Sequence, residues 1–89
     1  MAKAEISWKR KLPDGTKVQV YAQLVGGEWR FFQRSRRYER WERVEDPPLE
    51  DWLALLDAVR RMVPRRRYMP EDELRLRRQI RERFPELEV

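Results

Sequence analysis

The pair Gly26-Gly27 constrains the fold more than any other feature, because it separates two runs in which apolar and polar residues alternate. Two adjacent glycines can both adopt positive φ, which favours a two-residue β-hairpin turn. The turn predicts antiparallel strands over residues 17–25 and 28–34. It also sets their register, with Leu24 opposite Trp29 and Tyr21 opposite Phe32.

This register divides the side chains of the hairpin between two faces, because successive residues of a strand point to opposite sides. We call the apolar side the inner face; it collects Val18, Val20, Ala22, Leu24, Trp29 and Phe31. We call the other side the outer face; it collects Lys17, Gln19, Tyr21, Gln23, Arg30, Phe32 and Arg34. The inner face is expected to be a core, and the outer face is basic with two neighbouring aromatic rings.

A second turn signal precedes this hairpin. The segment Pro13-Asp14-Gly15 favours a type I turn followed by a residue with positive φ. It joins a predicted strand over residues 5–12 to the next one and pairs Leu12 with Thr16. Even-numbered residues then meet even-numbered ones, so Lys9 and Lys11 join the outer face. Two independent turns thus predict the same two-faced sheet.

The segment after Arg34 is more ambiguous. A tight turn at Arg36-Arg37 would lead into a fourth strand over residues 38–44, with Trp41 opposite Phe32 and Val44 near Trp29 on the inner face. Arginine does not favour positive φ, so this turn is chemically poor. The spacing of three between Tyr38, Trp41 and Val44 would also suit a short helix.

Two helices are expected in the second half. Asp46 can cap a helix over residues 47–63 that begins at two prolines. Its apolar stripe is wide and should cover the inner face; it consists of Leu49, Trp52, Leu53, Leu56, Val59 and Val63, widened by Leu55 and Met62. Acidic residues in the first turn and Arg60-Arg61 in the last suit the helix dipole. A second helix over residues 70–84 has a thin stripe of Leu76, Ile80 and Phe84, with several acid–arginine pairs at helical spacing.

These elements predict an α+β fold. The expected architecture is a single domain over residues 1–89, in which a three- to four-stranded antiparallel meander is followed by two helices. The first helix packs on one face of the sheet. A chain of 89 residues can build one small core.

Composition excludes several classes of protein. The chain has no Cys and no His, so a disulfide framework is excluded and a zinc site is not expected. No apolar run approaches the ~18 residues that a membrane-spanning helix requires, and the N-terminus lacks a secretion signal. We therefore expect a cytoplasmic protein without a membrane partner. The net charge is +5, and most of the excess lies in residues 1–46, with 11 basic against 7 acidic residues.

The outer face is the first candidate binding site. Basic residues flank Tyr21 and Phe32 there, with Trp41 as a possible third ring. Single-stranded nucleic acids bind such surfaces, because lysine and arginine neutralise phosphates while bases stack on aromatic rings. The alternative is an ordinary cross-strand ring pair, covered by Lys and Arg stems or by the second helix.

A second basic feature is the tract Arg60-Arg61 followed by Arg65-Arg66-Arg67. Guanidinium groups bind phosphates in a bidentate manner, so this tract can contact a nucleic acid. The alternatives are complementation of the helix dipole and ion pairs with nearby carboxylates. The arginines of the 70–84 helix are better explained as a solvated charged face.

No catalytic constellation is evident, because no hydroxyl or lysine nucleophile has an obvious base partner. Asp46, Glu50 and Asp51 are explained by a helix start better than by Mg²⁺ binding. We therefore expect a non-enzymatic protein without cofactors that binds nucleic acid, with single strands or RNA preferred. Its candidate site residues are Lys9, Lys11, Lys17, Tyr21, Arg30, Phe32, Arg34, Arg65, Arg66 and Arg67. The alternative is a protein-interaction module or accessory subunit that presents Trp, Tyr and Arg to an acidic protein surface.

Overall fold

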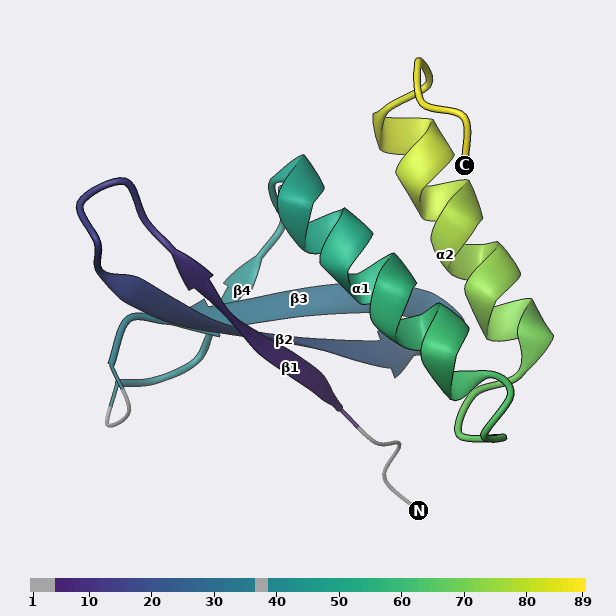
Figure 1. The fold of residues 1–89 in the computed structure, drawn as a ribbon, viewed down its shortest axis with the longest axis horizontal. Helices are drawn as coiled ribbons and strands as arrows, with labels where there is room; N and C mark the ends of the chain where they lie inside the picture. The colour runs from purple at the N-terminus through teal and green to yellow at the C-terminus, as the bar shows by residue number, and fades with distance from the viewer. Residues whose placement is uncertain (1–4, 37–38) are drawn as a thin grey trace.

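The computed structural model describes residues 5–36 and 39–89 and has the predicted α+β architecture. An antiparallel sheet with the strand order β1-β2-β3-β4 is followed by two helices (Figure 1). The elements are β1 (Ile6–Lys11), β2 (Lys17–Val25), β3 (Glu28–Arg34), β4 (Glu42–Val44), α1 (Leu49–Met62) and α2 (Pro70–Arg83).

Both predicted hairpins have the predicted register. In the first, Lys11 lies opposite Lys17, and the Leu12 N–H donates to the Thr16 carbonyl at 2.7 Å. In the second, residues 21–25 pair with residues 28–32 as the turn requires. Gly26 and Gly27 have φ values of 58° and 81°, which only glycine adopts readily. The two turns therefore determine which side chains share a face.

The fourth strand is shorter than expected, and its register differs by two residues. β4 comprises only three residues, and Arg43 rather than Trp41 lies opposite Phe32. Val44 lies opposite Phe31, not near Trp29, although it is on the inner face as expected. The prediction of a tight Arg36-Arg37 turn was wrong, because β3 ends at Arg34 and β4 begins at Glu42. Arg37 and Tyr38, on which part of the predicted turn and the start of the predicted strand fall, lie outside the described residues.

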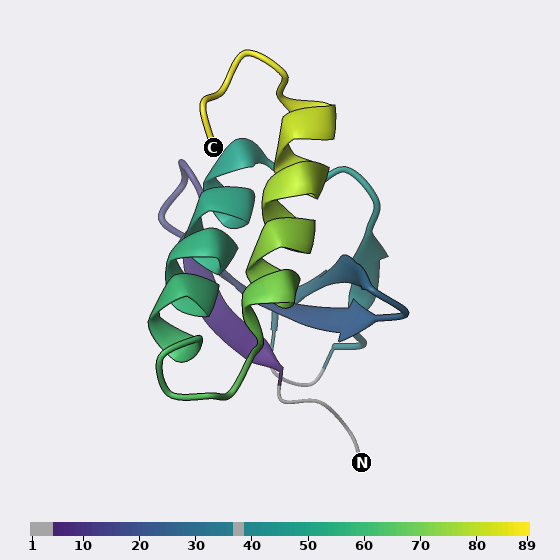
Figure 2. The same ribbon diagram turned by 90° about the vertical axis from the view of Figure 1, so that its right-hand side faces the viewer.

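Both helices lie side by side on the inner face of the sheet (Figure 2). From α1, the Trp52 ring meets the Phe31 ring edge-on at a centroid distance of 4.5 Å. From α2, Leu76 and Ile80 are fully buried in the same core as the inner-face residues. The core thus lies between one sheet face and a layer of two helices.

Two details of α1 differ from the predictions. Asp46 does not cap the helix; Pro48 occupies the N-cap position, and the Asp46 carboxylate contacts Arg83 at 3.4 Å. Leu53 is 41 % exposed, whereas Leu55 is fully buried. The buried stripe is rotated because α2 packs beside α1 and draws the Leu55 side of the helix into the core.

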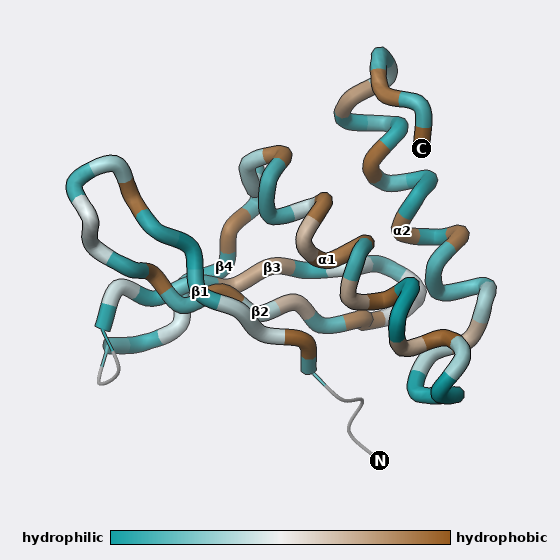
Figure 3. Tube along the Cα trace, viewed as in Figure 1, coloured by the Kyte–Doolittle hydropathy of each residue, from teal (hydrophilic) through white to brown (hydrophobic). Residues whose placement is uncertain are grey.

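α2 is largely hydrophilic, with apolar positions at intervals along the helix (Figure 3). Asp72 accepts a hydrogen bond from the Met69 N–H at 3.0 Å and thereby caps the helix start. The Gln79 side chain bonds the main chain of Trp29, accepting from its N–H at 2.8 Å and donating to its carbonyl at 3.3 Å. Since β4 pairs only with residues 31–33, Gln79 takes the place of a neighbouring strand at Trp29.

Over residues 5–36 and 39–89, the structure has no helix that is both long and apolar enough to cross a bilayer.

Candidate nucleic-acid interface

Neither helix covers the outer face, because α1 and α2 both pack on the opposite side of the sheet. The alternative in which the second helix covers Tyr21 and Phe32 is therefore wrong. The lysines of this face are exposed, whereas its aromatic and arginine residues are half-buried. The exposed group is Lys9, Lys11 and Lys17; the half-buried group is Tyr21, Arg30, Phe32 and Arg34.

Three aromatic rings form a cluster on this face. Tyr21 and Phe32 stack nearly parallel, with centroids 4.7 Å apart and an interplanar angle of 13°. Trp41 meets Tyr21 edge-on at 4.6 Å and is 36 % exposed. Partial burial raises the pKa of the Tyr21 hydroxyl, and the charge of Glu5 raises it further. The cross-strand pair predicted as the structural alternative is thus present, and Trp41 adds an exposed ring to it.

Arg34 is held in place beside this cluster. Its Nε donates to Gln19 Oε1 at 2.7 Å, and its guanidinium lies 4.3 Å from the centroid of the Trp41 ring. A cation–π contact of this kind contributes ~0.5–1 kcal/mol of stabilisation at an exposed site. Arg34 and Trp41 also line a groove of about 390 Å³ with Ser7, Trp8, Lys9 and Gln19. The groove offers an aromatic wall and two basic side chains on its lining.

Arg43 is an outer-face residue that the sequence prediction missed. It lies opposite Phe32 in the β3–β4 pair and is exposed. The sequence does indicate this position, because Val44 is apolar and points to the inner face, so its neighbour Arg43 in the same strand must point to the outer face. The error came from the assumed turn, which placed Trp41 at this position.

The tract Arg65-Arg66-Arg67 does not join the outer face. It forms the connector between α1 and α2, in the helical layer on the other side of the sheet. The three side chains are exposed, and Arg66 has a φ of 60°, in the left-handed region. The structure therefore presents two separate basic surfaces.

No family model matches this chain, and no curated protein and no solved structure is significantly similar to it. The side chains themselves are therefore the basis for a functional conclusion.

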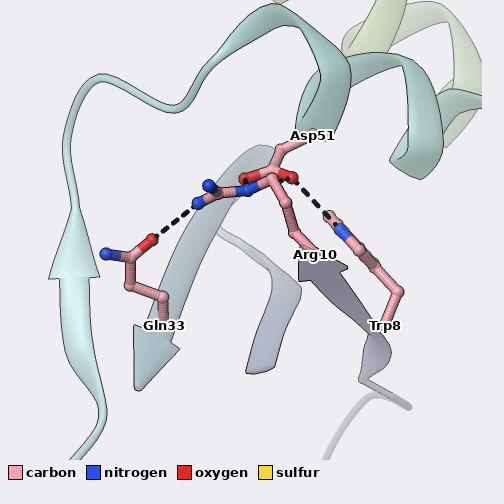
Figure 4. A network of polar contacts seen from close by, with 4 residues as sticks. All are labelled: Trp8, Arg10, Gln33 and Asp51. Carbon is pink, nitrogen blue, oxygen red and sulfur yellow. Dashed lines mark hydrogen bonds and ion pairs between the residues drawn. The ribbon is translucent and has the colours of Figure 1, made fainter. Parts of the chain in front are cut away.

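The inner face also contains a polar network that the sequence prediction missed. Arg10 pairs with Asp51 at 3.1 Å, and the Trp8 indole N–H donates to the same carboxylate at 3.2 Å (Figure 4). Arg10 also donates to Gln33 Oε1 at 3.0 Å. Asp51 is 2 % exposed, so these contacts compensate a buried charge rather than form a metal site. In the described part of the chain, no group of three acidic side chains is arranged to hold a metal ion.

Proposed function

We propose that this protein is a small, non-enzymatic nucleic-acid-binding protein that binds single strands, RNA in particular, on the outer face of its sheet. The observation that supports this proposal is an exposed indole beside basic side chains on a sheet face that neither helix covers. A sheet with exposed rings and surrounding cations suits single strands, whose bases are free to stack.

The roles divide between two kinds of side chain. Lys9, Lys11 and Lys17 are exposed and provide mobile positive charges for the phosphates. Trp41 provides the stacking surface, since Tyr21 and Phe32 already stack on each other. Stacking of one base on such a ring is worth ~1–3 kcal/mol.

A fluorescence anisotropy titration with a labelled single-stranded oligonucleotide tests this proposal. Trp41→Ala is expected to weaken binding by about 5- to 150-fold, the equivalent of one lost stacking contact. Leu53→Ala is the matched control, because Leu53 is similarly exposed but lies on the helical layer. Equal affinities of the Trp41→Ala variant and the control would contradict the proposal.

The salt dependence of the same titration tests the phosphate contacts. Log K should fall linearly with log salt, and Lys9→Ala combined with Lys11→Ala should reduce the steepness of that slope by ~1.4, since each phosphate contact to a single strand contributes ~0.7. We propose Arg65, Arg66 and Arg67 as a further phosphate contact, so Arg65→Ala with Arg66→Ala should also flatten the slope. An unchanged slope in that double variant would restrict the site to the outer face.

The alternative proposal is a protein-interaction module that uses the same surface. The Arg34–Trp41 contact favours it, because Trp and Arg are enriched among residues that dominate binding at protein interfaces. Absence of oligonucleotide binding at low salt, with Trp41 still exposed in the folded protein, would favour this alternative.

A further inference from the structure

A second cavity lies at the edge of the sheet, where β4 separates from β3. It has a volume of about 320 Å³, roughly ten times the share of one molecule in liquid water. Its lining comes from β3, the segment 43–47, α1 and α2, and it includes three arginines, namely Arg30, Arg43 and Arg83. Glu28 and Glu45 also contribute, so the lining carries one more positive than negative charge.

Two hydrogen-bond donors among the lining residues lack acceptors. Over the described residues, the buried side-chain N and O atoms without a partner are Arg30 Nε and Trp52 Nε1. Trp52 is 1 % exposed, so its indole N–H does not face solvent in this arrangement. A buried donor without an acceptor costs ~1–3 kcal/mol, and native structures rarely leave one. Both residues line the same cavity, but each N–H is covered in the present arrangement of its walls, so an acceptor in the cavity reaches it only when a wall moves.

The walls around these donors differ in how firmly they are held. Gln79 is fixed by its two hydrogen bonds to Trp29. Arg83 is held less firmly; its guanidinium lies 5.3 Å from the Trp52 ring centroid and contacts Asp46, whose side chain is 95 % exposed. An exposed ion pair of this kind contributes little, so Arg83 can move away from the indole at small cost.

We propose that this cavity binds a phosphate group. Phosphate oxygens are acceptors that suit both the unpartnered N–H groups and the three guanidinium groups, and arginine binds them in a bidentate manner. Movement of Arg83 would admit the group to the Trp52 indole. The site shares Arg30 and Arg43 with the outer face, but it does not require a strand bound there, because its phosphate is either a free phosphate or the terminal phosphate of a strand.

The test is a titration of the intact protein with inorganic phosphate, followed through the indole N–H signals in a ¹H–¹⁵N correlation spectrum. The Trp52 signal is expected to shift downfield and to saturate as its N–H acquires an acceptor. Trp8 and Trp29 are internal controls, because their indole N–H groups already donate to Asp51 and to the Asp72 carbonyl. Chloride at equal ionic strength controls for screening. A Trp52 signal that does not move, or that moves equally with chloride, overturns the proposal.

A charge variant keeps the test independent of changes in the core. Arg30→Gln is expected to weaken phosphate binding at least tenfold, whereas Arg30→Lys, which keeps the charge but lacks Nε, should weaken it less. Arg60→Gln is the matched control, since Arg60 is exposed on α1 and does not line the cavity. Equal affinities of the Arg30→Gln and Arg60→Gln variants would overturn the assignment.

Two oligonucleotides distinguish the sources of the phosphate. If the site takes a strand terminus, a 5′-phosphorylated oligonucleotide shifts the Trp52 signal at lower concentration than the same strand with a 5′-hydroxyl. If the two strands behave alike while inorganic phosphate still shifts the signal, the site takes free phosphate. Failure of Trp41→Ala to affect oligonucleotide binding would contradict the proposed function and leave the phosphate titration unaffected, because Trp41 does not line this cavity.

Discussion

The two faces of the sheet are formed by the same strands, but the inner face is buried and the outer face is partly exposed. On the inner face, Val20, Ala22 and Phe31 are at most 1 % exposed, and on the outer face their immediate neighbours Tyr21 and Phe32 remain half-buried. Phe31 and Phe32 are adjacent in sequence and chemically identical. The difference is caused by the helices, which both cover one side. In this sheet, the position of an aromatic residue at an odd or even place in its strand therefore decides whether its ring is buried in the core or is accessible for binding.

The test of this contrast with the largest expected effect replaces the two adjacent phenylalanines separately. Phe31→Ala should lower the free energy of unfolding by ~3–5 kcal/mol, because it opens a cavity in a packed core. Phe32→Ala should cost ~1 kcal/mol, since it removes one ring stack on an open face. Chemical denaturation of both variants measures the difference. Comparable losses would mean that the outer face is also part of the core.

A second test compares two ion-paired aspartates of α1. Asp51→Ala should destabilise the fold by ~3 kcal/mol or more, because it leaves Arg10 buried without its partner. Asp57 pairs with Arg61 at 3.1 Å, but both side chains are about 70 % exposed, so Asp57→Ala should cost less than ~1 kcal/mol. Denaturation midpoints give the comparison. A small effect of Asp51→Ala would show that water reaches the inner face there.

The third test concerns the edge of β3. Gln79→Ala removes both hydrogen bonds to the Trp29 main chain and should destabilise the protein by ~1–3 kcal/mol. Arg78→Ala, at an exposed neighbouring position, is the control. Hydrogen exchange of the Trp29 amide should accelerate in the Gln79 variant only. Unchanged exchange would mean that this amide is protected by another group.

The smallest effect is a pH dependence at the buried tyrosine. Burial raises the pKa of Tyr68 above its ordinary value of 10, and the charges of Asp72 and Glu5 raise it further. Below about pH 10, both the folded and unfolded states hold the proton, so stability is unaffected. As the pH rises above that value, the unfolded chain loses its proton first, and stability falls until the folded state also titrates. Tyr68→Phe should reduce this alkaline loss, as measured by unfolding between pH 9 and 11.

The first three strands could be predicted from the sequence to single-residue register, because Gly26-Gly27 and Pro13-Asp14-Gly15 each specify one turn geometry. The β3–β4 connection could not, since neither Arg36 nor the residues near it impose a turn. The rotation of α1 that exposes Leu53 depends on where α2 packs, which its thin apolar stripe does not determine. The outer face with its lysines was predictable from parity alone.

The Asp51 network and the Arg30–Trp52 cavity were not predictable, because they join side chains from different elements at distances that only tertiary packing sets. From the sequence alone, Asp51 is explained equally well as an acidic residue that complements the helix dipole, and Trp52 is explained as part of the buried apolar stripe. Parity places Arg10 on the inner face opposite Val18, but nothing in the pattern indicates that its partner there is the Asp51 carboxylate.

The bond between Gln79 and Trp29 also bears on self-association. An open strand edge can recruit the same strand of another molecule and extend into a fibre. Because a side-chain amide occupies the main-chain groups of Trp29, a second chain can add along this border only after displacing α2. Gln79 thus protects the part of the β3 edge that the short β4 strand does not cover against the addition of a strand from another molecule.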